Sequence, residues 1–284
     1  MTKCVVALVG DLHVNSTVAL CPPSVVLDDG GMYRASKAQR YIWRHWIKYW
    51  AEVGQAREEA GAGAPLFVVI NGEAADDNHH ATTQLVTRNP ADQLKFALLA
   101  LEPVCRLLRP GDKVFVTRGT EAHSGANAAL DETIARELGA EPADREMEIV
   151  SHWRLLAEFG KVRFDISHHP PGGGSRLPWA RGTFANRLAA MTMWEYMEKG
   201  TKPPHLRVYG HVHNPADSYD QFPTRALVNP SWQLCTAYGH RIGGGVLPVG
   251  GSYAVCENGE YTLRKRYVTW DTGGYWNWRH DDNI

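Results

Sequence analysis

The sequence predicts an α/β fold, because short, nearly continuous apolar runs alternate with longer segments of helical periodicity. The runs Cys4–Gly10 and Leu66–Ile70 are typical of strands that are buried on both faces. Between them, from Ser36 to Gly61, apolar side chains recur at the spacing of a helix. The chain has 284 residues, 44% of them hydrophobic, and contains no internal repeat, low-complexity tract or clear linker. We therefore expect one α/β domain over residues 1–284.

The N-terminal half is expected to hold three strands and three helices. Ser36 is the predicted N-cap of the first helix, whose aromatic stripe would face the core, and Asn89-Pro90 starts the second helix. Proline, aspartate and glycine predict a loop over 21–35. In order, the expected elements are strand Cys4–Gly10, helix 37–60, strand Leu66–Ile70, helix 90–108, strand Val114–Thr117 and helix 127–138, which stops before Gly139.

The C-terminal half is expected to contain two hairpins, which turn at Gly160 and at Asn258-Gly259. In order, the expected elements are strands Trp153–Phe159 and Lys161–Ser167, helix Phe184–Lys199, strands Leu206–Tyr209 and Ala226–Val228, and strands Tyr253–Cys256 and Tyr261–Val268.

Composition excludes several classes of protein. The apolar fraction is too high for a disordered chain, and a net charge of −1 argues against a strongly basic nucleic-acid coat. Five cysteines without a CxxC pair argue against a disulfide framework or a thiolate zinc site and indicate a reducing compartment. Without a signal peptide or an apolar run of roughly 20 residues, a cytoplasmic chain without a membrane partner is expected. Thirteen histidines leave a metal site with nitrogen and oxygen ligands open.

Five strand-like runs each end in a cluster of residues that can bind a metal. In open α/β sheets, the ligand crevice lies beyond the carboxyl ends of the strands, so these clusters can converge. Strand alternation would also direct both side chains of an Asp-x-His or His-x-His pair to one side. A carboxylate that bridges two divalent ions about 3.5–4 Å apart is typical of phosphoester hydrolysis. The clusters are Asp11/His13, Glu73/Asp76, Glu121/His123, His168/His169 and His211/His213.

In this order and strand context, the sequence resembles the calcineurin-like metallophosphoesterase superfamily, whose motifs are DxH, GDxxD, GNH(D/E), H and GHxH. The resemblance covers roughly residues 5–215. The sequence segments RGTEAH, HHPPGGG and GHVHNPADSYD are similar to segments of uncharacterised bacteriophage and prophage metallophosphoesterases. A phage origin would place the protein in the cytoplasm of a bacterial host. The matching segments are Asp11-Leu12-His13, Gly72-Glu73-Ala74-Ala75-Asp76, Gly119-Thr120-Glu121-Ala122-His123, His168-His169-Pro170-Pro171 and Gly210-His211-Val212-His213.

The resemblance implies two packed mixed β-sheets flanked by helices, completed by C-terminal strands within 226–270. It also implies two divalent metal ions, foremost manganese, with iron, zinc, nickel or magnesium as alternatives. Glu73 would bridge the ions, and Asp76 would orient a ligand. His168 is preferred to His169 as the ligand of its motif. By position, Asp11, His13 and His213 would hold the first ion, and His168 and His211 the second.

Two departures from the family pattern affect these assignments. Glu73 replaces the bridging aspartate and is one methylene longer. Thr120 stands at the asparagine ligand position, so Glu121 could supply the missing ligand oxygen, and His123 would stabilise the leaving-group oxygen. Alternatively, Glu121 pairs with Arg118 or caps the next helix.

A glycine loop follows the fourth motif and carries arginines whose planar donor forks suit phosphate. Arg176 and Arg181 could clamp a substrate phosphate, or they could be solvated charges on a flexible loop.

The implied activity is hydrolysis of phosphodiester bonds, in nucleic acid or nucleotides, through attack by a metal-activated hydroxide. Basic faces at 34–48 and 264–266 favour DNA, RNA or a nucleotide, whereas the net charge of −1 weakens the nucleic-acid case. One alternative is a small-molecule phosphomonoesterase or nucleotide pyrophosphatase. Another is a metal-binding module that has lost catalysis. Nothing in the sequence indicates an oligomeric state.

Overall fold

Two five-stranded mixed sheets pack face to face in the computed structural model, which describes residues 3–77, 82–172, 178–241 and 245–270. In the first sheet, β1, β4 and β5 are parallel, and β11 and β12 are antiparallel to their neighbours. The order is β12 (Glu260–Val268), β11 (Val249–Glu257), β1 (Cys4–Val9), β4 (Leu66–Asn71) and β5 (Lys113–Thr117).

The second sheet has a parallel centre, β7, β8 and β10, between two antiparallel edge strands. A separate two-stranded hairpin lies outside both sheets. The order of the second sheet is β6 (Leu155–Phe159), β7 (Val162–Ile166), β8 (Leu206–Tyr209), β10 (Arg225–Val228) and β9 (Ala216–Asp217), and the hairpin consists of β2 (Ser24–Val26) and β3 (Met32–Arg34).

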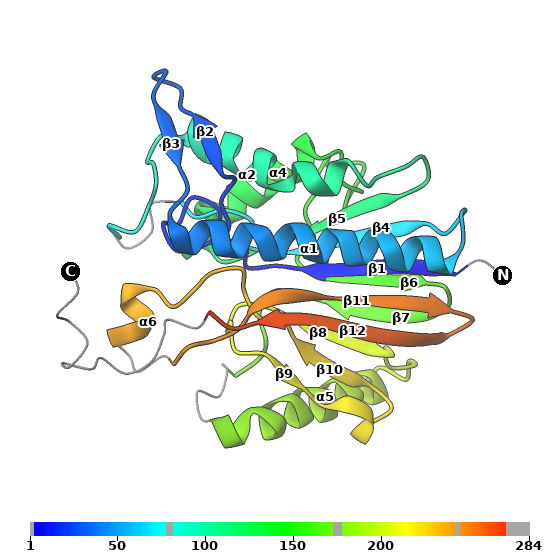
Figure 1. Cartoon of the computed structure of the whole chain (residues 1–284). Coiled ribbons are helices and arrows are strands. Elements are labelled where there is room, and N and C mark those ends of the chain that lie inside the picture. The colour runs from blue at the N-terminus through cyan, green and yellow to red at the C-terminus, as the bar shows by residue number, and fades with distance from the viewer. Residues whose placement is uncertain (1–2, 78–81, 173–177, 242–244, 271–284) are drawn as a thin grey trace.

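Helices cover the outer face of each sheet, which gives the four-layer arrangement visible in Figure 1. The longer helices are α1 (Lys37–Ala60), α2 (Pro90–Cys105), α4 (Ala129–Glu137) and α5 (Arg181–Glu198). The shorter ones are α3 (Glu121–Ser124), α6 (Ala237–Arg241) and the 3₁₀ turns at Ala126–Ala128, Pro178–Ala180 and Tyr219–Gln221. The predicted class, two packed mixed sheets flanked by helices, is confirmed.

Strand alternation on β1 explains why the core has two compartments. Val5, Ala7 and Val9 pack under the helices of the first sheet. Val6 and Leu8 point the other way, into the apolar layer between the two sheets. A strand buried on both faces needs apolar side chains at every position, which is what the sequence of β1 supplies.

Helix α1 begins and ends where the sequence predicts. The Ser36 hydroxyl accepts from the Gln39 amide at 3.2 Å, and the Gln39 side chain accepts from the Ser36 amide at 2.9 Å, which forms a capping box. The predicted aromatic stripe is buried, with Trp46 and Tyr49 both 0% exposed. In the part of the chain that the structure describes, no helix is long and apolar enough to cross a membrane.

Several predicted boundaries differ from those in the structure. Helix α2 ends at Cys105, because Leu107 and Leu108 form shorter i−3 hydrogen bonds to Val104 and Cys105. Helix α4 begins only at Ala129, because positive φ angles at Asn127 (56°) and Ala128 (55°) interrupt the helix.

The predicted loop over 21–35 contains the hairpin β2–β3, whose turn closes through Leu27 N donating to Gly31 O at 2.8 Å. In the C-terminal half, β9, α6 and the two 3₁₀ turns have no counterpart among the predicted elements.

Candidate metal centre

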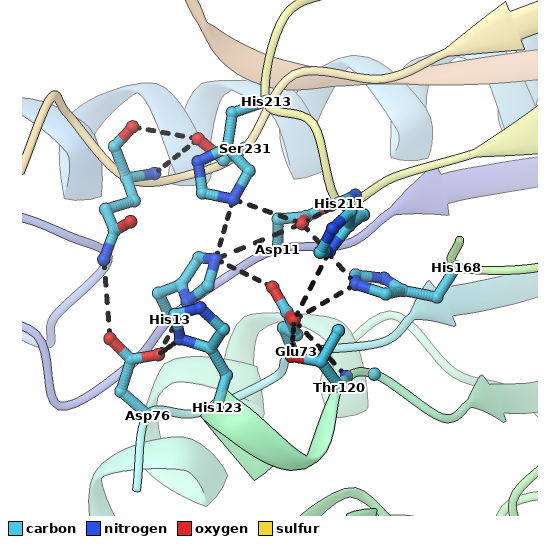
Figure 2. A network of polar contacts seen from close by, with 12 residues as sticks. Asp11, His13, Glu73, Asp76, Thr120, His123, His168, His211, His213 and Ser231 are labelled. Atoms are coloured by element: carbon cyan, nitrogen blue, oxygen red, sulfur yellow. Dashed lines mark hydrogen bonds and ion pairs between the residues drawn. The ribbon is translucent and has the colours of Figure 1, made fainter. Parts of the chain in front are cut away.

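Loops that follow five strands converge on one cluster of polar side chains (Figure 2). Three of these strands belong to the first sheet and two to the second, and each lies in the parallel part of its sheet. The expected crevice beyond the carboxyl ends of the strands is therefore built by both sheets together. Asp11 and His13 follow β1, Glu73 and Asp76 follow β4, His123 follows β5, His168 follows β7, and His211 and His213 follow β8.

The backbone, rather than the strand pleat, directs these side chains toward one another. β1 already ends at Val9, so the prediction that strand alternation places Asp11 and His13 on one side is wrong. Left-handed φ angles instead turn the chain at alternate residues, which brings both side chains to the same centre. The same conformation recurs in the loops after β4 and β8. The five residues concerned are Asp11 (φ 49°), His13 (46°), Glu73 (52°), His211 (68°) and His213 (56°).

Neighbouring loops hold these turns in place. The amides of Asp11 and His13 donate to the carbonyl oxygens of Gly72 and Glu73, both at 3.0 Å. A Cβ atom on Gly72 would lie 2.5 Å from Nδ1 of His168, and one on Gly119 would lie 2.5 Å from Cγ of Glu73. These two glycines therefore leave room for His168 and Glu73 to approach the backbone closely.

A first group of four ligand atoms comes from Asp11, His13, Glu73 and His213, and these atoms lie within 4.8 Å of one another. Nε2 of His13 lies 2.9 Å from Nε2 of His213 and 3.2 Å from a Glu73 oxygen. Nε2 of His213 lies 3.3 Å from an Asp11 oxygen. Two carboxylates and two imidazoles form a donor set that suits a divalent cation.

A second group comes from Glu73, His168 and His211. The other Glu73 oxygen, Oε1, lies 3.2 Å from Nε2 of His168 and 3.9 Å from Nδ1 of His211. Both nitrogen atoms are buried and have no hydrogen-bond partner in the part of the chain that the structure describes. Because a buried polar atom without a partner is costly, two such atoms facing one carboxylate oxygen fit a bound cation.

Asp76 connects two histidines behind the first group. One of its oxygens lies 2.6 Å from Nδ1 of His13 and 2.9 Å from Nδ1 of His123, and its other oxygen accepts from Gln233 at 3.4 Å. In the same way, Nδ1 of His168 donates to the carbonyl oxygen of Asn71 at 2.8 Å. These contacts direct Nε2 of His13 and His168 toward the cluster.

Burial and charge complement each other within the cluster. Burial raises the pKa of the Glu73 carboxyl, but His168 and His13 outweigh this and hold that pKa well below its usual range. His13 and His123 likewise hold the pKa of Asp76 below its usual range against the effect of burial. Burial disfavours a charged His168, yet Glu73 and Asp11 raise its pKa to about 9. Both carboxylates are therefore ionised, which a ligand such as Glu73 requires.

Among the described residues, the ligand groups reach solvent mainly through three histidines. Asp11 and His13 are 0% exposed and Glu73 is 1% exposed, whereas the side chains of His123, His211 and His213 are 23–31% exposed. A ligand would therefore approach along these three histidines.

Glu121 does not join the cluster, contrary to its predicted ligand role. It is exposed, and its carboxylate accepts from the Asn127 amide at 3.1 Å, as in the capping alternative. The position facing Glu73 is taken by Thr120, whose hydroxyl donates to Oε1 at 2.5 Å. Helix α3 begins at Glu121, and its first turn directs Glu121 toward Asn127 while His123 faces Asp76.

Of the remaining predicted residues, His169 lies at the edge of the cluster. His169 is exposed and covers the ring of His211, with 3.7 Å between ring centroids. Arg181 opens α5 and is half-buried, and its Nε atom has no hydrogen-bond partner among the described residues. Arg176 lies outside the described residues.

Asp131 is a supporting residue that the sequence interpretation missed. Its fully buried carboxylate accepts from the amides of Gly119 (2.7 Å), Ala74 (3.1 Å) and Glu73 (3.3 Å), and from the Ser124 hydroxyl (2.8 Å). It thereby joins the loops that follow β4 and β5. A usable signal exists, because Asp131 occupies the apolar stripe of α4 together with Ile134 and Ala135.

Comparison with protein-family models gives no match, and neither does comparison with curated proteins. Solved structures do show similarity. Vacuolar Protein Sorting 29 from Cryptosporidium parvum is 12% identical, with a TM-score of 0.42 over 95% of this chain and 100% of that chain. Hypothetical protein PH1004 from Pyrococcus horikoshii is 12% identical, with a TM-score of 0.46 over 96% and 90%. A dimetal phosphatase from Danio rerio is 10% identical, with a TM-score of 0.44 over 94% and 98%. Likenesses this distant place no constraint on activity.

Proposed function

We propose that the chain is a calcineurin-like metallophosphoesterase that hydrolyses phosphodiester bonds of nucleic acid or nucleotides with two divalent metal ions. The position of Glu73 is the observation that carries this proposal. One of its oxygens belongs to the group with Asp11, His13 and His213, and the other faces His168 and His211. A carboxylate placed between two sets of ligand atoms is the arrangement expected of a bridging ligand.

In this proposal, Asp11, His13 and His213 hold one ion, His168 and His211 hold the other, and Glu73 bridges them. Two bound divalent ions would supply positive charge that binds phosphoryl oxygens. They would also lower the pKa of a bound water, so that it ionises near neutral pH. The mixed imidazole and carboxylate ligands suit manganese, iron, zinc or nickel better than they suit magnesium.

The chain itself supplies the remaining groups. His123 stands at the partly open side of the cluster and would donate a proton to, or stabilise, the leaving-group oxygen. Asp76 orients the His123 ring through Nδ1. Arg181, the first residue of α5, would bind a non-bridging phosphate oxygen through the terminal nitrogens of its guanidinium.

Exposed basic side chains support a polyanionic substrate despite the net charge of −1. They line the solvent face of the N-terminal half of α1 and the strand before it. These residues are Arg34, Lys37, Arg40, Arg44 and Lys48.

The test is metal-dependent hydrolysis of bis(p-nitrophenyl) phosphate, together with metal content by elemental analysis. We expect about two ions per chain, and a loss of at least 100-fold in kcat/KM for His211→Ala. His45→Ala, at a half-buried position of α1 outside the three ligand groups, is the matched control and should stay near wild type.

Each opposing result has a definite meaning. Absence of turnover with manganese, nickel, zinc and iron would overturn the proposal in favour of a metal-binding module. A preference for p-nitrophenyl phosphate over diesters and DNA would instead favour the small-molecule phosphatase.

A further inference from the structure

Helix α6 buries none of its side chains and contributes nothing to the hydrophobic core. A five-residue helix is not stable by itself in water, so its conformation depends on the contacts at its ends. Ala237 N donates to the Gln84 side chain at 2.7 Å, and Gly239 N and His240 N donate to the Thr236 hydroxyl and carbonyl at 3.1 and 2.9 Å. The chain therefore holds this exposed turn in place with polar contacts.

The segment that leads into α6 is attached to the metal centre. Trp232 N donates to Asp11 O at 2.8 Å, and the Gln233 side chain donates to Asp76 at 3.4 Å. Tyr238 lies five residues after Gln233, a reach of at most about 18 Å. Figure 1 shows α6 beyond the ends of β1 and β4, on the side where these strands end. Helix α6 thus stands at the rim of the candidate site.

The side chains that α6 presents have a distinctive chemistry. Tyr238 is 61% exposed, and His240 and Arg241 are also exposed. An exposed aromatic ring beside a guanidinium is the combination that binds an unpaired nucleobase by stacking and its phosphate by paired hydrogen bonds. In a duplex, both faces of a base are already covered by neighbouring bases.

We propose that α6 is the substrate-recognition element, in which Tyr238 stacks on an unpaired nucleobase and Arg241 binds an adjacent phosphate. This inference rests on the proposed phosphodiesterase function and narrows its substrate to single-stranded nucleic acid or nucleotides with an accessible base. Recognition of this kind does not require a strongly basic protein, which agrees with the net charge of −1.

The experiment compares three substrates on the metal-loaded full-length protein: a short single-stranded oligonucleotide, the same strand with abasic sites, and the corresponding duplex. Tyr238→Ala should raise KM for the base-bearing strand at least about fivefold, with kcat nearly unchanged. Tyr238→Phe keeps the ring and should stay within about twofold of wild type. Trp194→Ala removes a ring that is 66% exposed in the second half of α5 and serves as the matched control.

The abasic strand separates stacking from other effects. Tyr238→Ala should leave the KM for the abasic strand unchanged. Arg241→Gln should raise the KM for both the base-bearing and the abasic single strand. An unchanged KM for the base-bearing strand in Tyr238→Ala, an equal rise for the abasic strand, or a preference for duplex would overturn the inference.

Failure of the proposed function is recognised separately, because the wild type would then hydrolyse neither bis(p-nitrophenyl) phosphate nor any oligonucleotide. In that case, the same oligonucleotides are labelled and titrated with the same protein variants, and fluorescence anisotropy gives the dissociation constants directly. The same pattern among the variants would support recognition by α6, and identical dissociation constants for wild type and Tyr238→Ala would exclude it.

Discussion

At the buried Asp131 carboxylate, three backbone donors from two loops meet the Ser124 hydroxyl of α3. Burial raises the pKa of this group, although the hydrogen bonds from Gly119, Ser124 and Ala74 oppose that shift. The carboxylate contacts the amide of Glu73 but belongs to neither ligand group that contains Glu73. Asp131 therefore acts on the candidate metal centre by fixing the backbone position of Glu73.

Asp131→Asn should weaken both the fold and the metal centre. An amide NH₂ would face backbone donors, and the unsatisfied groups should cost about 1–3 kcal/mol of unfolding free energy. Because the Glu73 loop would shift, metal affinity should fall about tenfold or more. Urea unfolding and metal titration measure the two effects.

Asp92→Asn is the control for this prediction. Asp92 is also a buried helical carboxylate that accepts from a backbone amide, here Asp28 N at 2.8 Å, but it lies outside the three ligand groups. It should lose stability and keep its metal affinity. Equal metal affinity in the Asp131 and Asp92 variants would show that the Asp131 contacts serve the fold alone.

The candidate site could be predicted only as far as its residues lie in local patterns. Asp11 and His13 stand directly after a recognisable strand, as do His211 and His213, so the sequence alone points to them. Asp131 and Gln233 contact the cluster from a helix and from an irregular segment, and no local pattern reveals what they contact. The sequence does not show that Thr120, rather than Glu121, faces Glu73, because the start of α3 at Glu121 decides this.

At the scale of elements, a buried strand could be predicted wherever its apolar run was uninterrupted, as in β1 and β4. The hairpin β2–β3 could not, because its strands have three residues each and only Val25 among them is buried. Helix α6 also lacks a pattern, since it buries nothing. Short surface elements exist because of tertiary contacts, which composition does not record.

Helix α4 is attached to the segment before β6 through Glu132. Its carboxylate accepts from the backbone amides of Val150 (3.1 Å) and Ser151 (2.8 Å) and from the Ser151 hydroxyl (2.5 Å). Burial opposes ionisation, but these hydrogen bonds and Arg136 lower the pKa of Glu132 from 4.5 to about 2.

This shift predicts a specific loss of stability in acid. Because the pKa is lower in the folded than in the unfolded chain, ionised Glu132 stabilises the fold above about pH 4.5. That stabilisation is lost as the pH falls toward about 2. The stability difference between wild type and Glu132→Gln, measured by urea unfolding from pH 7 to pH 2.5, should therefore shrink in this window. Glu137→Gln, at an exposed position on the same helix, should show no such narrowing.

At the scale of the whole molecule, the candidate metal centre brings together loops of both sheets. Asp11, His13 and Glu73 come from loops of the first sheet, and His168 and His211 from loops of the second. His168 contacts Glu73 and His213 contacts Asp11, and in each contact the histidine follows a strand of the second sheet and the carboxylate a strand of the first. Cations bound there would link the two halves of the fold.

Metal binding should therefore raise the thermal stability of the whole chain. A ligand at 100 times its dissociation constant contributes about 2.7 kcal/mol, which corresponds to roughly 5 °C for a protein of this size. Differential scanning fluorimetry with Mn²⁺, Zn²⁺, Ni²⁺ and Mg²⁺, and after EDTA treatment, measures the shift. His211→Ala should show a smaller rise, and an identical melting temperature with and without every metal would contradict the prediction.

The left-handed turns at Asp11, His13, Glu73, His211 and His213 set foldability against function. A non-glycine residue in this conformation destabilises the fold by of order 1 kcal/mol, and aspartate and histidine tolerate it better than most. Glycine at any of these positions would relieve the local strain while it removes a ligand atom. Laboratory selection for heat resistance in the presence of a chelator should therefore enrich glycine at these five positions. With metal supplied, the same selection should keep the ligands, because bound cations stabilise the fold by more than one left-handed residue costs.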